Sequence, residues 1–468
     1  ALRHSPPLLR IARFEGTTTL RQLLRAPRRV DDITLTGFEV AIPPSRAPGQ
    51  PRFPRRDGRP RDRIPEPVST SEPSPPVEVP PAPTNPSPVV IRHLRANGMV
   101  LVVLPRERTK LPRRFVLHEL ELQDVAADRA MSFKAVVDNP VPRGRIETRG
   151  TFGPWQSATP GHTPLAAAYR ANQVDLNTIR GIAGLVRTEG RFSGVLERIE
   201  ATGTTSSQDF QLDAADRPMP LRTTFTVIVD GTNGNTWIAP ATAHLGKATA
   251  ILAKGGIVKA EDRRGRTVDL GMRIDGGRVE DVLALAVHTD EPIMKGLIDL
   301  SGTLLIPPGE GRVVQRMKLD GRFALRQAAF TSDTVQARID ELSRRARGKP
   351  QAHDIANVVS AFQGRYKMSG GVLSFPSLSF RVEGARVDMA GRYTVLTQAL
   401  EFDGRIRMDA GVSQMVGGKK RFLLKVIDPL FRRNGATEFP IRIRGTARKP
   451  QFGVDVKTTL KRALLPGR

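Results

Sequence analysis

The chain of 468 residues contains no cysteine, few aromatic residues and no long apolar run. Without cysteine it forms neither a disulfide scaffold nor a thiolate metal site, and it suits an oxidising or a reducing compartment equally well. Its longest apolar runs, among them residues 99–104, are six residues long, whereas a membrane-spanning helix needs about 20. Aromatic residues make up only 5% of the chain, so a thin, extended sheet suits this composition better than one large compact core.

Recognisable catalytic motifs are also missing from the sequence. The seven histidines are scattered, without the spacing of metal ligands. The sequence has no G-x-S-x-G nucleophile elbow, phosphate-binding loop or H-E-x-x-H motif. Residues 230–235 resemble the start of a calcium loop, but Ala241 stands where the bidentate glutamate would be, so a hairpin is the better interpretation. We therefore expect neither enzyme activity nor a bound metal or cofactor.

Acidic residues are too few to balance the basic ones, and the chain carries a net charge of +26. Such a charge favours nucleic acid, an anionic membrane surface or an acidic polymer as partner, and charge alone does not choose among them. A nucleic-acid binder would concentrate the charge beside aromatic side chains. Here arginine is spread over polar strand positions, as on a solvated strand face, so we expect no specific nucleic-acid partner. Examples are Arg381, Arg405, Arg407, Arg442 and Arg444.

What the chain does contain, from end to end, is a short segment in which apolar and polar residues alternate. Residues 377–384, 400–408 and 439–445 are examples. A period of two places successive side chains on opposite faces of a strand, so each segment has one apolar face and one polar face. Many such strands in series predict a mainly β protein, an elongated antiparallel groove or curved sheet with a few short helices.

Four segments have helical spacing instead. Residues 20–24, 176–186 and 278–287 predict short helices, and residues 332–347 predict a longer one. In this last segment Val335, Ile339 and Leu342 fall on one face.

Composition divides the chain into five segments. An N-terminal β segment (1–42) precedes an insertion rich in proline and arginine (43–88). Because proline cannot complete a sheet ladder, we expect this insertion to be disordered or extended. A region of repeated strands follows (89–330), then a C-terminal β region that includes the predicted helix (331–456), and finally a basic tail (457–468).

The apolar strand faces are the candidate binding surface. Alternation is the same in an open groove and in a β-sandwich, where two sheets bury such faces against each other about 10 Å apart. The residues themselves therefore leave both arrangements open. The candidate groove residues are Phe192, Phe225, Val227, Val229, Phe323, Leu325, Leu378, Phe380, Val382, Leu400, Phe402, Ile406, Met408, Ile441 and Ile443.

A second candidate site is the basic, amphipathic segment 412–433. A segment of this kind can lie on an anionic membrane surface. The alternative is a cap that closes the end of the sheet, and Asp428 and Pro429 interrupt the amphipathic pattern. The candidate membrane contacts are Lys419, Lys420, Arg421, Phe422, Lys425, Phe431, Arg432 and Arg433.

Several motifs follow one another in a familiar order. Residues 362–373 lead into 380–391 and 400–404, and residues 440–452 close the series with the form P-I-x-I-x-G-T followed by K-P-x-F. This order resembles the C-terminal region of AsmA-like bacterial envelope proteins. Weaker similarities extend the match over about residues 89–456 and, more faintly, 1–42.

The resemblance implies a fold, a location and a function. AsmA-like proteins form long β-grooves with an apolar inner face and are usually anchored in the inner membrane by an N-terminal helix. By resemblance, this chain would be periplasmic and would hold or transfer phospholipid acyl chains, contributing to outer-membrane assembly or homeostasis. Its partners would be phospholipids and an anionic membrane surface, and other envelope proteins are further candidates. The chain departs from the family in lacking the anchoring helix and in carrying the insertion.

A different class of function fits the same pattern of residues. A closed β-sandwich would leave no apolar face for lipid. The chain would then be an envelope scaffold that binds other proteins without transporting lipid.

Overall fold

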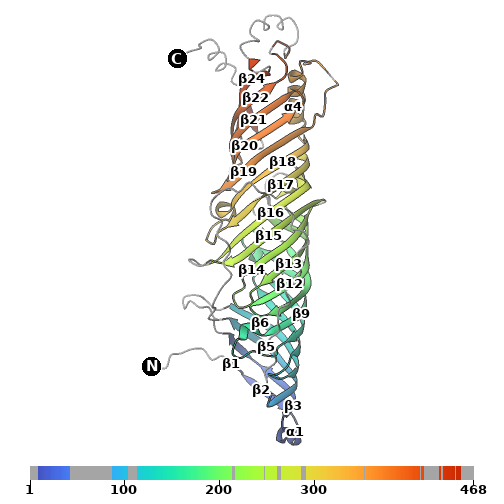
Figure 1. The fold of residues 1–468 in the computed structure, drawn as a ribbon, viewed down its shortest axis with the longest axis vertical. Helices are drawn as coiled ribbons and strands as arrows, with labels where there is room; N and C mark the ends of the chain where they lie inside the picture. The colour runs from blue at the N-terminus through green and yellow to red at the C-terminus, as the bar shows by residue number, and fades with distance from the viewer. Residues whose placement is uncertain are drawn as a thin grey trace, which may run out of the picture.

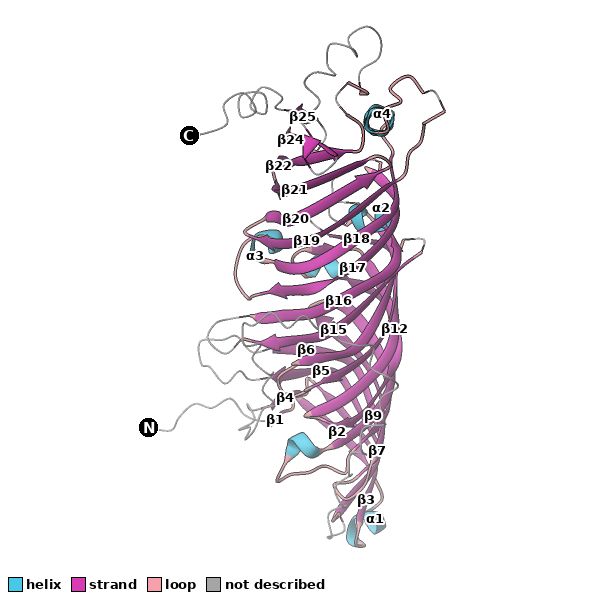
Figure 2. Cartoon of the chain, turned by 45° about the horizontal axis from the view of Figure 1, so that its top comes forward, coloured by secondary structure: helices cyan, strands magenta, loops and turns pink. Residues whose placement is uncertain are grey.

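The fold is one large, curved β-sheet that does not close on itself (Figure 1). This computed structural model describes residues 9–42, 87–103, 113–212, 217–246, 248–260, 265–285, 291–352, 354–411, 413–415, 432–433, 436–447 and 449–454. Strands make up most of the described chain and the helices are few and short (Figure 2). The predicted fold class, an elongated curved sheet of amphipathic strands with a few helices, is therefore confirmed.

The first half of the sheet combines long strands with a few short ones. Its strands are β1 (Leu9–Arg10), β2 (Arg13–Thr17), β3 (Arg28–Thr36), β4 (Glu39–Ile42), β5 (Val89–Val103), β6 (Arg113–Val125), β7 (Met131–Pro140), β8 (Arg143–Phe152), β9 (Pro164–Asp175), β10 (Ile182–Ala183), β11 (Leu185–Val195), β12 (Arg198–Leu212) and β13 (Met219–Val229).

The second half continues in the same way. Its strands are β14 (Thr236–Leu245), β15 (Thr249–Lys259), β16 (Arg266–Arg278), β17 (Met294–Ile306), β18 (Lys318–Phe330), β19 (Ser360–Ser369), β20 (Val372–Val382), β21 (Ala385–Thr394), β22 (Ala399–Met408), β23 (Arg432–Arg433), β24 (Ala436–Gly445) and β25 (Pro450–Val454). The α-helices are α1 (Leu20–Leu24), α2 (Val279–Ala284), α3 (Val313–Arg316) and α4 (Asp333–Ala346).

From β5 to β25 the long strands form an antiparallel meander, in which each pairs with the next. The antiparallel expectation is wrong at one place: β3 and β4 both pair with β5 in parallel. A parallel pair needs a long crossover connection. The insertion predicted from the sequence connects β4 to β5 and supplies that length, although its residues 43–86 lie outside the described part of the chain.

The molecule is elongated because strands add side by side. The path from β2 to β25 crosses about 20 strand-to-strand steps of about 4.8 Å, which amounts to roughly 100 Å along the sheet. Helix α1 lies at one end of this path and α4 lies near the other (Figure 1). Within the described residues no second sheet packs over either face, so the sandwich arrangement is not found there.

The predicted helices at 20–24, 278–287 and 332–347 are confirmed as α1, α2 and α4. The helix predicted over 176–186 is wrong. Only one 3₁₀ turn forms there, at Leu176–Thr178, and the chain then enters β10 and β11. Gly181 and Gly184 have φ values of +95° and +118°, in a region closed to an α-helix. Among the described helices, none is long and apolar enough to cross a membrane.

Candidate functional site

The cross-strand register joins the apolar faces of the strands into one continuous surface. One row of paired residues crosses sixteen neighbouring strands, from β2 to β19, and contains no charged side chain. The row consists of Phe14, Leu35, Ala96, Leu120, Ala135, Thr148, Tyr169, Gly190, Gly203, Phe225, Ala241, Ala253, Met272, Gly302, Gly321 and Tyr366, where Phe14 and Leu35 belong to β2 and β3.

The neighbouring row of paired residues, which lies one residue to the side of the first row on every strand, contains many charged side chains. It includes Glu147, Arg170, Glu189, Arg273 and Arg322, and it lies on the other face of the sheet because side chains alternate. The sheet therefore has one apolar face and one charged face over most of its length. We call the first of these the apolar groove, defined by the uncharged row and by the residues that share its face.

All fifteen groove residues predicted from the sequence share this face by register. None of their side chains is exposed. Five are buried, namely Leu325, Phe380, Val382, Phe402 and Ile406. The other ten are partly buried, which leaves room for further contact on the groove side. The sequence reasoning missed other members of the face, such as Leu120, Tyr169 and Met272, because glycine, alanine and threonine dilute the alternation around them.

Tyrosine rings cover glycines in the middle of the groove. A Cβ atom added to Gly302 or Gly321 would lie 2.5 Å or 2.6 Å from the hydroxyl oxygen of Tyr366. This ring therefore reaches across two neighbouring strands. Glycine in a strand allows a sharp local bend. An aromatic ring from an adjacent strand then covers the glycine backbone, which has no side chain of its own to shield it. The glycines and the ring that covers them keep the lining of the groove continuous and free of projecting side chains at these positions.

The same arrangement occurs at Tyr169, whose hydroxyl would lie 2.7 Å from a Cβ atom on Gly203. The chain has three tyrosines, and burial raises the pKa of Tyr169, Tyr366 and Tyr393 alike. For Tyr366 the pKa rises to about 12, with the charge of Asp320 as a second cause. All three phenols are therefore neutral at physiological pH, and the groove gains no charge from them.

Phenylalanine rings extend the lining toward the C-terminal end of the sheet. Phe375 lies between Phe323 and Phe402, with ring centroids 6.1 Å and 5.7 Å away. Phe362 and Phe380 are closer, at 4.7 Å. These rings come from β18, β19, β20 and β22, so each contact joins neighbouring or next-neighbouring strands and stiffens the groove wall.

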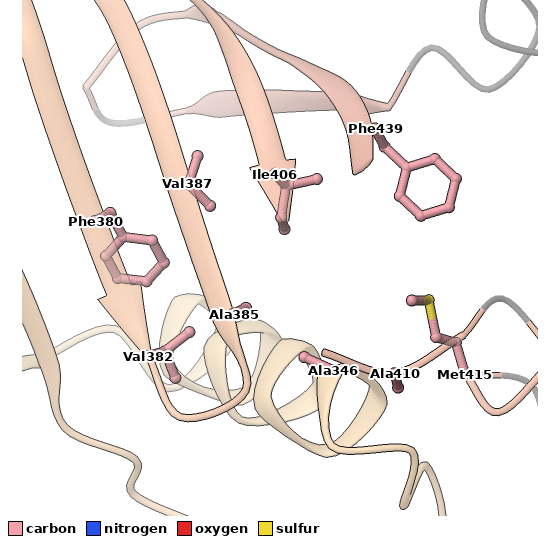
Figure 3. Close-up of a cluster of buried hydrophobic side chains, with 9 residues drawn as sticks. All are labelled: Ala346, Phe380, Val382, Ala385, Val387, Ile406, Ala410, Met415 and Phe439. Atoms are coloured by element: carbon pink, nitrogen blue, oxygen red, sulfur yellow. The ribbon is translucent and has the colours of Figure 1, made fainter. Parts of the chain in front are cut away.

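Helix α4 covers the end of the groove. Phe380, Val387, Ile406 and Phe439, which come from four strands, belong to one cluster of buried side chains with Ala346 at the end of α4 (Figure 3). Ile339 and Leu342 of the predicted helical face pack against the same cluster. The groove is thus closed by protein at this end.

Buried polar groups hold α4 in place. The carboxylate of Asp340 accepts hydrogen bonds from the backbone N–H groups of Asn357 and Val358, both at 2.9 Å, and from Gln336 Nε2 at 2.9 Å. Ser343 Oγ donates to the backbone oxygen of Glu383 at 2.9 Å, in the turn between β20 and β21. These contacts fix the helix to the loop that follows it and to the sheet.

The opposite face carries ion pairs. Arg444 pairs with Asp403 at 2.8 Å, and Arg405 with Glu438 at 3.2 Å. Between β6 and β14 this face is hollowed over about 1060 Å³, and charged and hydroxyl side chains such as Glu121, Arg149 and Thr204 make up much of the lining. Much of the positive charge on the strands is therefore balanced locally across the sheet.

Two further sets of sequence expectations concern metal sites and the segment predicted to contact a membrane. No group of three or more His, Asp or Glu residues that could hold a metal occurs within the described ranges. The predicted membrane-contact residues 419–425 and Phe431 lie outside the described residues. Arg432 and Arg433 form β23, without a description of their side chains.

Comparisons with known proteins return nothing that resembles this chain. No protein-family model matches it, and no match was found among curated proteins or solved structures. The candidate site therefore depends on the geometry of the sheet alone.

Proposed function

We propose that this chain is a non-enzymatic protein of the Gram-negative cell envelope that holds phospholipid acyl chains in its apolar groove or passes them along it. The resemblance to AsmA-like proteins suggests the place and purpose: the periplasm, tethered to the inner membrane, in outer-membrane assembly or homeostasis. The observation that carries the proposal is the uncharged row that runs from Phe14 to Tyr366 across sixteen strands.

An apolar face of this length needs a cover. Within the described residues the helices cover only parts of it, and α4 does so at one end. Residues of its middle part, such as Phe192, Phe225 and Phe323, are only partly buried. Burying one methylene group gains about 0.8 kcal/mol, so an acyl chain supplies the cover that a second sheet provides in a sandwich.

The repetition of the lining suits movement. Successive strands present the same kinds of side chain to the groove. A bound acyl chain therefore meets similar contacts at each position, and no position is a deep free-energy minimum that would stop its movement. Transfer then needs no covalent step. The charged face does not compete for acyl chains, because its side chains are solvated and many of them are paired.

The proposal is tested by native mass spectrometry and lipid extraction on detergent-free protein purified from a Gram-negative host. We expect phospholipid to co-purify with the wild-type chain. Phe225→Asp, which puts a charge into the groove, reduces the bound lipid. Thr226→Asp is the matched control, because it adds the same charge one residue away on the opposite face, and it leaves the bound lipid unchanged.

Circular dichroism verifies that both variants keep their strand content, and Phe192→Asp serves as a second groove variant if Phe225→Asp does not fold. A folded wild-type protein free of lipid contradicts the proposal. Equal lipid loss in Phe225→Asp and Thr226→Asp also contradicts it, because lipid would then not depend on the apolar face.

A further inference from the structure

Helix α1 exposes three leucines at the end of the molecule opposite α4 (Figure 1). Leu20 and Leu24 are 72% and 77% exposed, and Leu23 is 39% exposed. Residues three and four apart lie on one face of a helix, so the three leucines form a single apolar ridge. Phe14, in the adjacent strand β2, is 60% exposed as well. We call these four residues the tip.

The ridge is held in position. Gln22 Oε1 accepts a hydrogen bond from the backbone N–H of Thr19 at 3.1 Å. Thr18 Oγ1 donates to the backbone oxygen of Arg29 at 2.8 Å, and this contact ties the start of α1 to β3. The leucines are thus exposed on an ordered helix whose polar side faces the sheet.

Four arginines lie on α1 and directly after it. Arg21, Arg25, Arg28 and Arg29 are all exposed. Among the described residues no carboxylate forms an ion pair with any of them. The nearby acidic residues are engaged elsewhere: Glu15 pairs with Arg13, and Asp31 with Arg92. Helix α1 and the start of β3 therefore carry four exposed cations that have no carboxylate partner among the described residues.

We propose that the tip binds an anionic lipid bilayer, with the leucines and Phe14 in the interfacial region and the arginines against lipid phosphates. Apolar side chains on one side of a short helix and cations beside them are the elements of interfacial binding, and each basic residue near an anionic surface strengthens it. The inference does not depend on the function proposed for the groove, because the leucines and arginines that carry it, unlike Phe14, are not part of the groove lining.

A fluorescent label tests the tip directly. The chain has no cysteine, so Leu24→Cys creates a unique site for an environment-sensitive fluorophore. Leu185→Cys is the matched control, because Leu185 is also exposed, at 50%, and lies far from the tip on β11. We expect vesicles of phosphatidylglycerol and phosphatidylcholine to shift the emission of the label at position 24 to the blue. Brominated acyl chains should quench it, whereas the label at position 185 should not respond.

Variants then separate the tip from the groove. In vesicle flotation, Leu20→Asp should weaken binding about tenfold or more, because the leucine no longer enters the interface. Arg21→Glu combined with Arg25→Glu should abolish the preference for anionic over neutral vesicles. Phe225→Asp should float like the wild type, since it changes only the groove.

Two results overturn the inference. The first is a label at position 24 that responds no more than the label at position 185. The second is a tip that makes the protein self-associate, as seen by analytical ultracentrifugation and abolished by Leu20→Asp, without binding vesicles; the leucines would then be a contact between copies.

Discussion

Replacing Asp340 with alanine should release α4 from the end of the groove. Asp340 is 7% exposed, and its carboxylate accepts three hydrogen bonds, two of them from the backbone of Asn357 and Val358. The substitution leaves those two N–H groups without an acceptor, at a cost of about 1 to 3 kcal/mol each, and removes charge-assisted bonds. We expect the docked position of α4 to lose about 3 to 5 kcal/mol, a local effect that leaves the sheet intact.

Hydrogen exchange measures this loss. A cost of 3 to 5 kcal/mol increases the population of the open state by about 10²- to 5 × 10³-fold, so amides in α4 should exchange faster by that factor while those of β16 do not. Glu341→Ala is the control, since Glu341 lies next to Asp340 on the exposed side of α4 and pairs with Arg345 on the same helix. Removing that pair should cost no more than about 0.5 kcal/mol. Unchanged exchange in Asp340→Ala, or equal effects of the two variants, would refute the reasoning.

Three further predictions concern the two faces of the sheet. Because burial raises the pKa of Tyr366 to about 12 from 10.0, its phenol stays protonated in the folded state while it ionises in the unfolded state. The free energy of unfolding should therefore fall between pH 10 and pH 12, less so in Tyr366→Phe, as measured by urea titration. Gly321→Ala should destabilise the fold by about 1 to 3 kcal/mol through overpacking against Tyr366, whereas Gly271→Ala, whose Cβ meets nothing closer than 3.9 Å, should not. Asp403→Ala breaks the exposed pair with Arg444 and should change the free energy of unfolding by no more than about 1 kcal/mol. A larger change, measured by thermal denaturation, would argue against a solvated charged face.

The sequence was sufficient for the local features of this fold. Alternation places Phe225 and Val227 on one side of their strand whatever the strand pairs with, and the spacing of Ile339 and Leu342 fixes the apolar side of α4. For this reason all fifteen predicted groove residues share one face of the sheet. The helical turn at residues 20–24 was likewise predictable from the spacing of its leucines.

Long-range features could not be predicted in the same way. Alternation does not say whether an apolar face meets a second sheet or stays open, because that depends on how the strands are arranged in space. The spacing of apolar residues over 176–186 is helical, but Gly181 and Gly184 adopt positive φ and stop the helix after one turn. The parallel pairing of β3 with β5 depends on the long connection between them and leaves no signal in either strand.

The covering of Gly302 and Gly321 by Tyr366 was also beyond the sequence, since these residues become neighbours only through the register of three strands. The resemblance to AsmA-like proteins suggested an open groove.

Site-specific photo-crosslinking in a Gram-negative host tests this central claim most directly. A benzophenone amino acid is placed at Phe225 or Phe323 in the groove, and at Thr226 or Arg322, their sequence neighbours on the opposite face. The account predicts that irradiation gives covalent phospholipid adducts at positions 225 and 323 and none at 226 and 322. Adducts at all four positions alike, or at neither groove position in a folded protein, would contradict it.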